Sequence, residues 1–310
     1  MRNAELVRPG LFCALALAAF ASAHGASVPG GEVTVREDVS YLAPDRTEKL
    51  DLYLPPGWSA QARGPALVWI HGGGWTGGAK GAPREENVCR TLAAKGYVCA
   101  SIDYRLGDGA WPQNLLDCKN GVRYLKAHAT EHGIDPARIA VAGGSAGGHL
   151  ALMVGLTAGK PEFEPQAPYP GVSSTVTCII DFYGPANLMN RQEVNKDGTP
   201  TGQRRLGGPA SVYGTSSMDA EVFKIASPVN HIHAKSPPVL ILHGRADGTV
   251  DYRQSEELAR VLKKHGVPHE FVLLDRVGHT FDLHTWAKKT MPRSVEPDVL
   301  KFLAKHNGER

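Results

Sequence analysis

A serine with glycines on both sides occupies residues 143–147, which read Gly-Gly-Ser-Ala-Gly and match the pattern G-x-S-x-G. The motif directly follows the apolar run 139–142 and directly precedes a helical pattern, so the chain must reverse sharply at Ser145. Glycines leave room for such a crowded turn. The turn would hold the Ser145 hydroxyl at the carboxyl edge of a sheet, where it can attack the carbonyl carbon of an acyl group.

A serine hydroxyl is a weak nucleophile at neutral pH, so a base must take its proton as it attacks. Among thirteen histidines, His279 is the preferred base because it lies in a glycine-containing loop after the last predicted strand. Asp247 follows the predicted strand 239–242 and is the preferred acid partner of the imidazole. Asp251 and Asp275 are its rivals. The chain order Ser, Asp, His is the order expected for this topology.

Two other histidines lie close to these residues in the sequence. His243 stands at the end of the strand before Asp247, and His149 lies one helical turn after Ser145. We interpret His243 as structural and His149 as a packing or capping residue.

A second glycine-rich segment, residues 71–75 (His-Gly-Gly-Gly-Trp), follows the apolar run 66–70. When a serine attacks a carbonyl, negative charge grows on the oxygen, and unobstructed backbone N–H groups can stabilise it. We expect these donors to be Gly73 and Gly74, joined by Ala146 at the start of its helix. A phosphate-binding loop is disfavoured because the Lys-Ser/Thr continuation of a P-loop is missing.

The remaining pattern alternates strands with helices, which predicts a mostly parallel central sheet with helices on both faces. Two opening antiparallel strands are expected within residues 32–55, and one domain is expected over residues 32–306. The further strands are predicted at 66–70, 97–102, 138–142, 175–183, 239–242 and 269–274. The helices are predicted at 84–95, 113–128, 146–156, 253–265 and 294–305. Residues 184–237 lack strong periodicity and are too long for an ordinary connection, so we interpret them as a lid-like insertion.

The first 23 residues have the features of a secretory signal peptide. Arg2 and Arg8 precede the apolar stretch 11–20, and small residues at 21–23 provide a cleavage site. An uncleaved anchor is the alternative, although the apolar stretch is shorter than the roughly 20 residues that a span needs. We therefore expect a secreted or periplasmic protein that has no membrane association after cleavage.

Composition limits the classes of function. The 310 residues carry a net charge of +3, and no stretch concentrates Lys and Arg among aromatic residues, so a nucleic-acid partner is not expected. No spacing of metal ligands is evident, and the attacking group and its base are both side chains, so no metal or cofactor is expected. After signal cleavage four cysteines remain, and their pairing stays open: Cys89, Cys99, Cys118 and Cys178.

Taken together, four segments resemble the carboxylesterases of the α/β-hydrolase superfamily. They are His-Gly-Gly-Gly-Trp at 71–75, Asp-Tyr-Arg-Leu at 103–106, Asp-Pro at 135–136 and Gly-Gly-Ser-Ala-Gly-Gly-His-Leu at 143–150. The likeness is greatest to the group of bacterial feruloyl and acetylxylan esterases, near the hormone-sensitive-lipase relatives. It implies the α/β-hydrolase fold, the catalytic triad Ser145, Asp247 and His279, and oxyanion donors at Gly73, Gly74 and Ala146.

The chain departs from the hormone-sensitive-lipase pattern because no helical cap precedes its first strands. This favours polar, exposed esters, such as acylated fragments of plant polysaccharides, over lipids. Trp75 and Trp111 follow two strand ends and could flank the pocket, either stacking on the substrate or packing in the core. Arg245 stands where relatives often carry an acidic residue.

The sequence therefore predicts an exported serine esterase that acts on a small-molecule or oligosaccharide ester with a short acyl, acetyl or feruloyl group. The same three residues could also cleave an amide, as in a peptidase or an aryl-formamidase. A third hypothesis is a non-catalytic binding protein built on a hydrolase scaffold.

Overall fold

A computed structural model describes residue 1 and residues 31–204, 210–217 and 220–308. The predicted signal peptide, residues 1–23, lies almost entirely outside this part of the chain. In the described residues, eight strands form one sheet in the spatial order β1-β2-β4-β3-β5-β6-β9-β10. Strand β2 pairs antiparallel with β1 and β4, and all other neighbours are parallel. The bounds of the strands are β1 Thr34–Val39, β2 Leu50–Leu54, β3 Gly64–Ile70, β4 Val98–Ile102, β5 Ile134–Gly144, β6 Ile179–Phe182, β9 Val239–Gly244 and β10 His269–Leu274.

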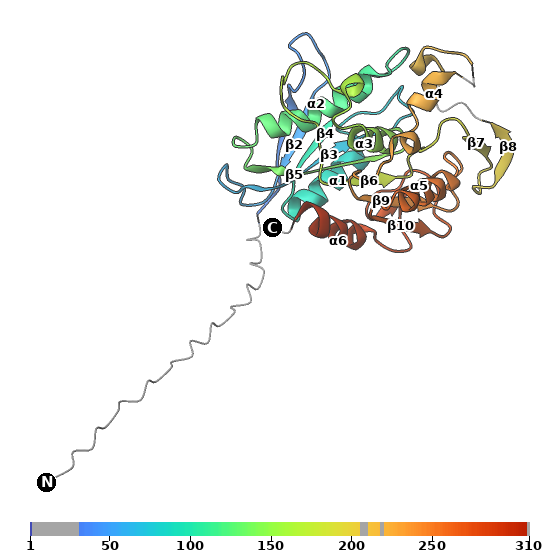
Figure 1. Ribbon diagram of the computed structural model, residues 1–310. Coiled ribbons are helices and arrows are strands. Elements are labelled where there is room, and N and C mark those ends of the chain that lie inside the picture. The colour runs from blue at the N-terminus through green and yellow to red at the C-terminus, as the bar shows by residue number, and fades with distance from the viewer. Residues whose placement is uncertain (2–30, 205–209, 218–219, 309–310) are drawn as a thin grey trace.

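Six α-helices accompany the sheet in the described residues, and α2 and α6 lie on opposite sides of it (Figure 1). Their bounds are α1 Pro83–Ala94, α2 Gln113–Ala127, α3 Ala146–Leu156, α4 Glu221–Ile225, α5 Arg253–Lys264 and α6 Glu296–Asn307. The prediction of a mostly parallel central sheet with helices on both faces is confirmed.

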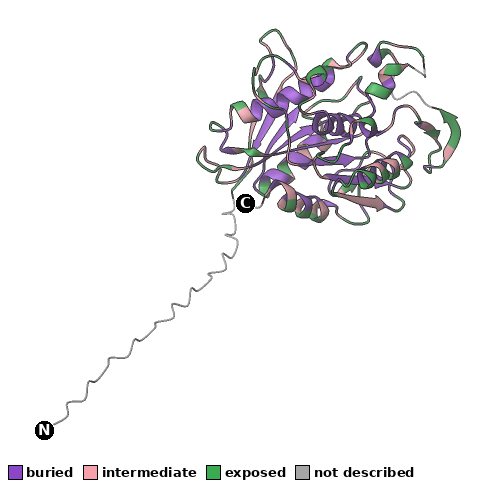
Figure 2. Cartoon of the chain, viewed as in Figure 1, coloured by how far each residue is buried: buried purple, intermediate pink, exposed green. Residues whose placement is uncertain are grey.

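The core consists of two apolar layers, because successive side chains of a strand point to opposite faces of the sheet. In β3, Val68 and Ile70 pack in the layer under α2, α3 and α5, whereas Leu67 and Trp69 pack in the layer over α1 and α6. All eleven residues of α3 are buried, as expected for a helix that is apolar all round. Figure 2 shows this burial of the strands and of α3.

The segment 184–237, predicted as an insertion, has local structure of its own. It contains a two-stranded sheet, β7 Gln192–Val194 with β8 Pro200–Arg204, which is largely exposed (Figure 2), and the short helix α4. The segment is tied to the loop after β4, because the N–H groups of Gly109 and Trp111 donate to the carbonyls of Ser211 and Val212. It therefore lies beside a loop at the carboxyl edge of the sheet.

Several element boundaries differ from the predictions. Strand β6 begins at Ile179 rather than at residue 175, and Thr177 before it is fixed by side-chain hydrogen bonds to Ile139 and Asn307. A short hairpin after β10, β11 Thr285–Trp286 with β12 Lys289–Thr290, was not predicted because two-residue strands have too little periodicity to detect.

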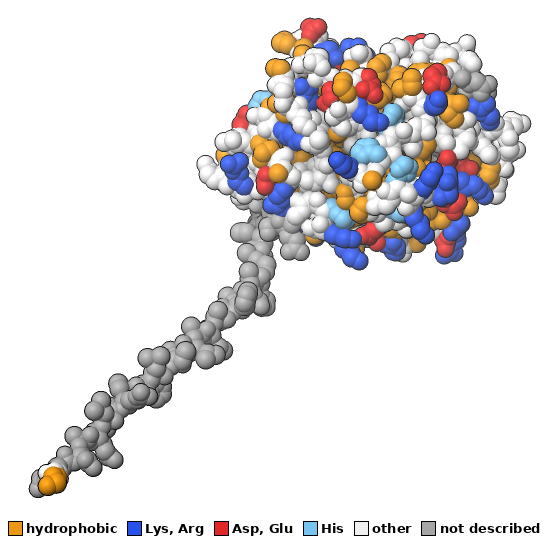
Figure 3. Space-filling view, viewed as in Figure 1, with side chains coloured by type: hydrophobic (Ala, Val, Ile, Leu, Met, Phe, Trp, Pro, Cys, Tyr) orange, Lys and Arg blue, Asp and Glu red, His pale blue; other side chains and the backbone are white. Residues whose placement is uncertain are grey.

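The four cysteines among the described residues are free, buried thiols. Cys99 lies in β4, and Cys178 directly precedes β6. No helix in residues 31–204, 210–217 and 220–308 is both long enough and apolar enough to cross a bilayer. Figure 3 shows basic and acidic side chains interspersed over the visible face rather than gathered by sign.

Candidate active site

Ser145 occupies a strained turn between β5 and α3. Its backbone has φ 59° and ψ −120°, a conformation that costs a residue with a side chain about 1–3 kcal/mol. The flanking glycines permit the turn, because a Cβ on Gly147 would lie 2.0 Å from the carbonyl oxygen of Ile70. A Cβ on Gly143 would lie 2.4 Å from the carbonyl oxygen of Gly147. The close packing of the backbone at Gly143 and Gly147 therefore explains the strained turn. The turn places the Ser145 side chain beyond the edge of the sheet.

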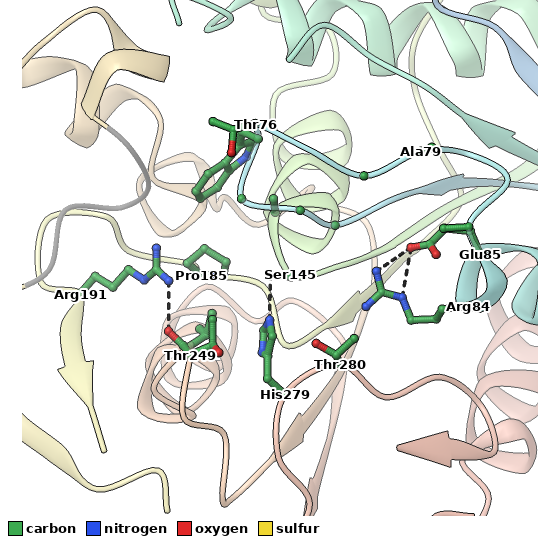
Figure 4. A pocket seen from close by; sticks show the side chains of 18 residues that line it. Thr76, Ala79, Arg84, Glu85, Ser145, Pro185, Arg191, Thr249, His279 and Thr280 are labelled. Atoms are coloured by element: carbon green, nitrogen blue, oxygen red, sulfur yellow. Dashed lines mark hydrogen bonds and ion pairs between the residues drawn. The ribbon is translucent and has the colours of Figure 1, made fainter. Parts of the chain in front are cut away.

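The structure brings the three predicted reactive side chains together. Nε2 of His279 lies 2.9 Å from Oγ of Ser145, and Nδ1 of His279 lies 2.6 Å from Oδ2 of Asp247 (Figure 4 shows the Ser145–His279 contact). The topology explains the meeting, because β5, β6, β9 and β10 are successive neighbours and the three loops leave their carboxyl ends. The arrangement forms a continuous path for a proton from the hydroxyl to the imidazole.

The two rival acids lie elsewhere. Oδ1 of Asp251 accepts from Nη1 of Arg253 at 3.0 Å, and Oδ1 of Asp275 accepts from Nε of Arg245 at 2.9 Å. Because Asp275 and Arg245 are both exposed, this ion pair is on the surface. Arg245, whose role the sequence left open, thus pairs with Asp275.

Asp247 is fully buried and accepts four hydrogen bonds from described residues. The N–H groups of Thr249 and Val250 donate to Oδ1 at 2.8 and 2.9 Å, and His279 and His243 both donate to Oδ2. Burial alone would raise the pKa of this carboxyl, but the hydrogen bonds from His243 and His279 outweigh it and hold the pKa well below the usual value. Asp247 is therefore ionised and fixed in orientation at neutral pH.

His243 has a closer relation to the site than the sequence indicated. Its Nε2 faces two acceptors, Oδ2 of Asp247 at 3.1 Å and the carbonyl of Val250 at 3.0 Å, so this nitrogen must carry a proton. Its Nδ1 lies 2.7 Å from Oγ of Ser255. The sequence does hold a signal for this contact, because His243 and Asp247 are only four residues apart at the end of one strand. Hydrophobic periodicity, however, does not predict contacts within such a turn.

The environment of His279 favours the neutral form of its imidazole. Burial lowers the pKa of His279 below its usual value, and the hydrogen bond and charge of Asp247 oppose this only in part. The ring of Tyr183 packs edge-on at 4.7 Å, while its hydroxyl donates to the carbonyl of Phe281 and accepts from Nη1 of Arg84. A neutral imidazole in a fixed position is the form that can accept a proton from Ser145.

The three predicted oxyanion donors line one cavity with Ser145. The N–H groups of Gly73, Gly74 and Ala146 have no hydrogen-bond partner among the described residues. Ala146 is the first residue of α3, where helix N–H groups lack partners within the helix. Gly73 has φ +116°, and a Cβ there would lie 2.1 Å from the carbonyl oxygen of Gly77. These donors are free to face a charge that develops beside Ser145.

The glycine loop is anchored from behind. His71 is buried and its Nδ1 lies 2.6 Å from the carbonyl oxygen of Gly72, while Tyr104 donates its hydroxyl to the carbonyl of His71 at 2.9 Å. The rings of His71 and Tyr104 also stack, with centroids 4.4 Å apart. The sequence motifs at residues 71–75 and 103–106 are therefore in direct contact in the structure.

The cavity has a volume of about 670 Å³. Figure 4 shows Arg84 and Glu85 on one side of Ser145, and Arg191, Pro185 and Thr249 on the other. Trp75 is part of the wall although only 2% of its surface is exposed.

The suggestion that Trp111 flanks the pocket is corrected by the structure. Trp111 is not among the described residues that line the cavity. Its ring packs against Phe163, His149 and Tyr213, because the hydrogen bond from its backbone N–H to Val212 places it beneath the insertion. His149 is fully buried there, and its Nε2 donates to the carbonyl of Ala226, so His149 packs as predicted. In the described residues, no three His, Cys, Asp or Glu side chains form a group that could hold a metal ion.

The sequence of this chain is similar to one protein family and to several curated proteins. Residues 50–262 match the model of the BD-FAE family. Among curated proteins, the probable carboxylic ester hydrolase LipM of Mycobacterium tuberculosis is 32% identical over 79% of this chain and 56% of its own length. Esterase LipQ of the same organism is 28% identical over 88% of this chain and 63% of its own. This chain thus spans between half and two thirds of the length of these relatives.

Solved structures are similar over nearly the whole described chain. The apo form of Thermogutta terrifontis esterase 2 has a TM-score of 0.69 and 28% identity, covering 92% of this chain and 97% of its own. A truncated carbohydrate esterase from gut microbiota has a TM-score of 0.73 and 24% identity, covering 89% of this chain and 97% of its own. At that identity the second likeness concerns the fold alone.

Proposed function

This chain belongs to the BD-FAE family and has the α/β-hydrolase fold, and from this premise we propose that it is an exported serine esterase that cleaves carboxylic esters through an acyl-enzyme. The observation that carries the proposal is the hydrogen-bonded sequence from Oγ of Ser145 to His279 at 2.9 Å and from His279 to Asp247 at 2.6 Å. The names of the relatives, which are esterases and a carboxylic ester hydrolase, support it.

In the first half-reaction, Oγ of Ser145 forms a bond to the carbonyl carbon of the ester while Nε2 of His279 takes the hydroxyl proton. The carbonyl oxygen becomes an oxyanion, which the N–H groups of Gly73, Gly74 and Ala146 stabilise. Asp247 stabilises the imidazolium that forms, through its hydrogen bond to Nδ1. When the intermediate collapses, the bond to the alcohol oxygen breaks and His279 returns the proton to the leaving alcohol.

In the second half-reaction, water takes the place of the alcohol. His279 removes one proton from the water as its oxygen bonds to the acyl carbon, and the bond between that carbon and Oγ of Ser145 then breaks. Ser145 recovers its proton from the imidazole, and a carboxylic acid leaves. The neutral state of His279, which burial favours, is the starting state that both half-reactions need.

The substrates we propose are short-acyl or carbohydrate-linked esters, such as acetyl or feruloyl esters. The wall of the cavity supports this, because it carries the polar side chains of Arg84, Glu85, Thr249 and Thr280 around the nucleophile. A long lipid chain would cover the N–H groups of Arg84 that have no partner among the described residues and would supply them with no acceptor, which is costly in a buried site. The signal-peptide features of residues 1–23 support export to the periplasm or the medium.

Hydrolysis of nitrophenyl acetate tests the proposal. The unaltered protein should release nitrophenol, and Ser145→Ala should lower kcat by about a thousandfold or more, because the nucleophile is lost. Ser173→Ala is the matched control, since Ser173 is an exposed serine whose hydroxyl contacts only Thr175 among described residues, and it should keep the native rate. Equal rates for the native protein and Ser145→Ala would refute the proposal.

A panel of esters tests the substrate class. Acetyl, butyryl and octanoyl esters of one alcohol, together with acetylated xylan and methyl ferulate, separate acyl length from alcohol type. We expect kcat/KM to fall as the acyl chain lengthens. A preference for octanoyl over acetyl esters would contradict the proposed substrate class and leave the serine mechanism intact.

A further inference from the structure

The guanidinium group of Arg84 is a polar feature of the cavity that the mechanism does not use. Arg84 lies in the first turn of α1, and its side chain reaches into the cavity beside Ser145, between Glu85 and Thr280 (Figure 4). Its side chain is only 18% exposed, so the group faces the cavity and not open solvent.

Arg84 has hydrogen-bond donors to spare. A guanidinium has five N–H groups. Nε and Nη2 each donate one to Oε1 of Glu85, at 3.1 and 2.5 Å, and Nη1 donates one to the hydroxyl of Tyr183 at 3.0 Å. One N–H on Nη1 and one on Nη2 have no partner among the described residues. In a cavity that substrate would close to water, such donors favour a ligand that supplies oxygen acceptors.

The guanidinium of Arg84 lies close to Ser145 and to the surroundings of His279, where the alcohol part of an ester could bind. A Cβ placed on Gly72 would lie 3.1 Å from Nη2 of Arg84 and 3.3 Å from Cβ of Ser145, so both groups border the same gap in front of Gly72. Arg84 also contacts Tyr183, whose ring packs on His279. Because His279 must hand its proton to the departing oxygen, an alcohol group held beside Arg84 would also lie close to the group that protonates it.

The charge of Arg84 is already balanced. Glu85, with a side chain only 3% exposed, pairs with the guanidinium through two hydrogen bonds. A full negative charge on the alcohol would therefore gain little over a neutral oxygen, and it would lie close to the Glu85 carboxylate. The site suits hydroxyl or ether oxygens, which accept hydrogen bonds without adding charge.

We propose that Arg84 is a specificity-determining residue whose two spare N–H groups contact neutral oxygen atoms in the alcohol part of the ester, so that polyhydroxylated alcohols such as sugars are favoured over apolar alcohols of equal size. This inference rests on the proposed esterase function. It assigns the preference for the alcohol to one side chain.

Two acetate esters with six-membered rings test the inference. Monoacetylated methyl xyloside carries ring and hydroxyl oxygens, whereas cyclohexyl acetate has none, and their acyl groups are identical. In Arg84→Met, which keeps the length of the side chain but has no donors, the ratio of kcat/KM for the xyloside to that for cyclohexyl acetate should fall about tenfold. Arg84→Lys, which retains a donor, should show a smaller fall and serves if Arg84→Met fails to fold.

Thr280→Val is the matched control, because it removes a hydroxyl from the same cavity and leaves the three hydrogen bonds of the Arg84 guanidinium intact. It should change the rates on both esters by the same factor. An unchanged ratio in the Arg84 variants, or an equal fall of the ratio in Thr280→Val, would overturn the inference. If the unaltered protein hydrolyses neither these esters nor nitrophenyl acetate, the proposed function fails and the inference fails with it.

Discussion

The imidazole of His243 lies 3.1 Å from Oδ2 of Asp247, the same carboxylate oxygen that accepts from His279. Both His243 and Asp247 are fully buried, and Nδ1 of His243 is held by Ser255. The oxygen that orients the base is thus itself oriented by a second imidazole. We therefore expect His243 to act through Asp247, as a positioning residue.

Replacing His243 with Phe should lower kcat about tenfold to a hundredfold with little change in KM, because one donor to a buried carboxylate is lost while a ring remains in the space. Steady-state kinetics on nitrophenyl acetate measures both constants. His243→Gln, which can still donate, should recover part of kcat.

A double substitution distinguishes a loss of kcat that acts through Asp247 from a general disturbance of the structure. In an Asp247→Asn background, whose kcat should already be reduced by about 10³–10⁴, His243→Phe should lower kcat no further. An equal proportional loss in both backgrounds would mean that His243 does not act through Asp247.

The pH dependence of kcat/KM should report the burial of His279. The neutral imidazole is the active form, and burial lowers its pKa, so the active form persists to lower pH than for a solvent-exposed histidine. We expect the acid limb of the profile to have its midpoint below the ordinary histidine value of about 6.5. A midpoint above that value would show that Asp247 outweighs burial, contrary to the packing around the ring.

Gly147→Ala should damage both stability and activity. Helix propensity alone predicts a gain from alanine in α3, but the new Cβ would lie 2.0 Å from the carbonyl oxygen of Ile70 and 2.5 Å from that of His71. The backbone that leads to Gly73 and Gly74 would have to move, so we expect a loss of about 2–4 kcal/mol in unfolding free energy and at least a hundredfold loss in kcat.

Gly77→Ala is the control for this substitution, because the nearest atom to its new Cβ is 3.9 Å away. Urea unfolding and nitrophenyl acetate kinetics compare the two variants. Similar behaviour of Gly147→Ala and Gly77→Ala would contradict the steric account of the serine turn.

Acid should destabilise the fold through His149. Burial lowers the pKa of His149 to about 4, although its hydrogen bond to Ala226 opposes this. Between the unfolded value of about 6.5 and the folded value, the unfolded chain binds a proton that the folded chain does not, so stability falls as pH falls. From pH 7 to pH 5 this residue should cost about 2 kcal/mol of unfolding free energy.

His149→Gln can still donate to Ala226 and does not titrate. Urea unfolding at both pH values should therefore show a smaller acid loss in the variant than in the native protein. The same acid loss in both proteins would contradict the assignment, and the buried His132, whose pKa is also lowered to about 4, would then be the next residue to replace.

Much of this architecture was predictable because strands that are buried on both faces leave continuous apolar runs. The range of α3 and that of β10 were predicted without error, and the order of strands and helices implied the parallel sheet. Boundaries next to loops were less accurate, as at β6, because hydrogen bonds from side chains such as Thr177 decide where regular pairing begins.

The meeting of Ser145, Asp247 and His279 was predictable for a topological reason. Carboxyl ends of neighbouring parallel strands share one edge of the sheet, so loops that are distant in sequence become neighbours. The contacts of Arg84 and His243 were not predictable in this way. Arg84 reaches the cavity from the first turn of α1, which carries no motif, and the contact of His243 depends on how one turn folds back on its own strand. For Trp111, the choice between stacking on the substrate and packing in the core stayed open, because the sequence does not show that the insertion covers its ring.

The proposed esterase activity depends most on Ser145 being a nucleophile that His279 activates. Reaction of the folded protein with a fluorophosphonate, followed by peptide mass mapping, measures this directly. We expect one modification, on Ser145, which is abolished in Ser145→Ala and slowed at least a hundredfold in His279→Ala. An unlabelled Ser145 in the folded native protein, or labelling at the same rate without His279, would contradict the account.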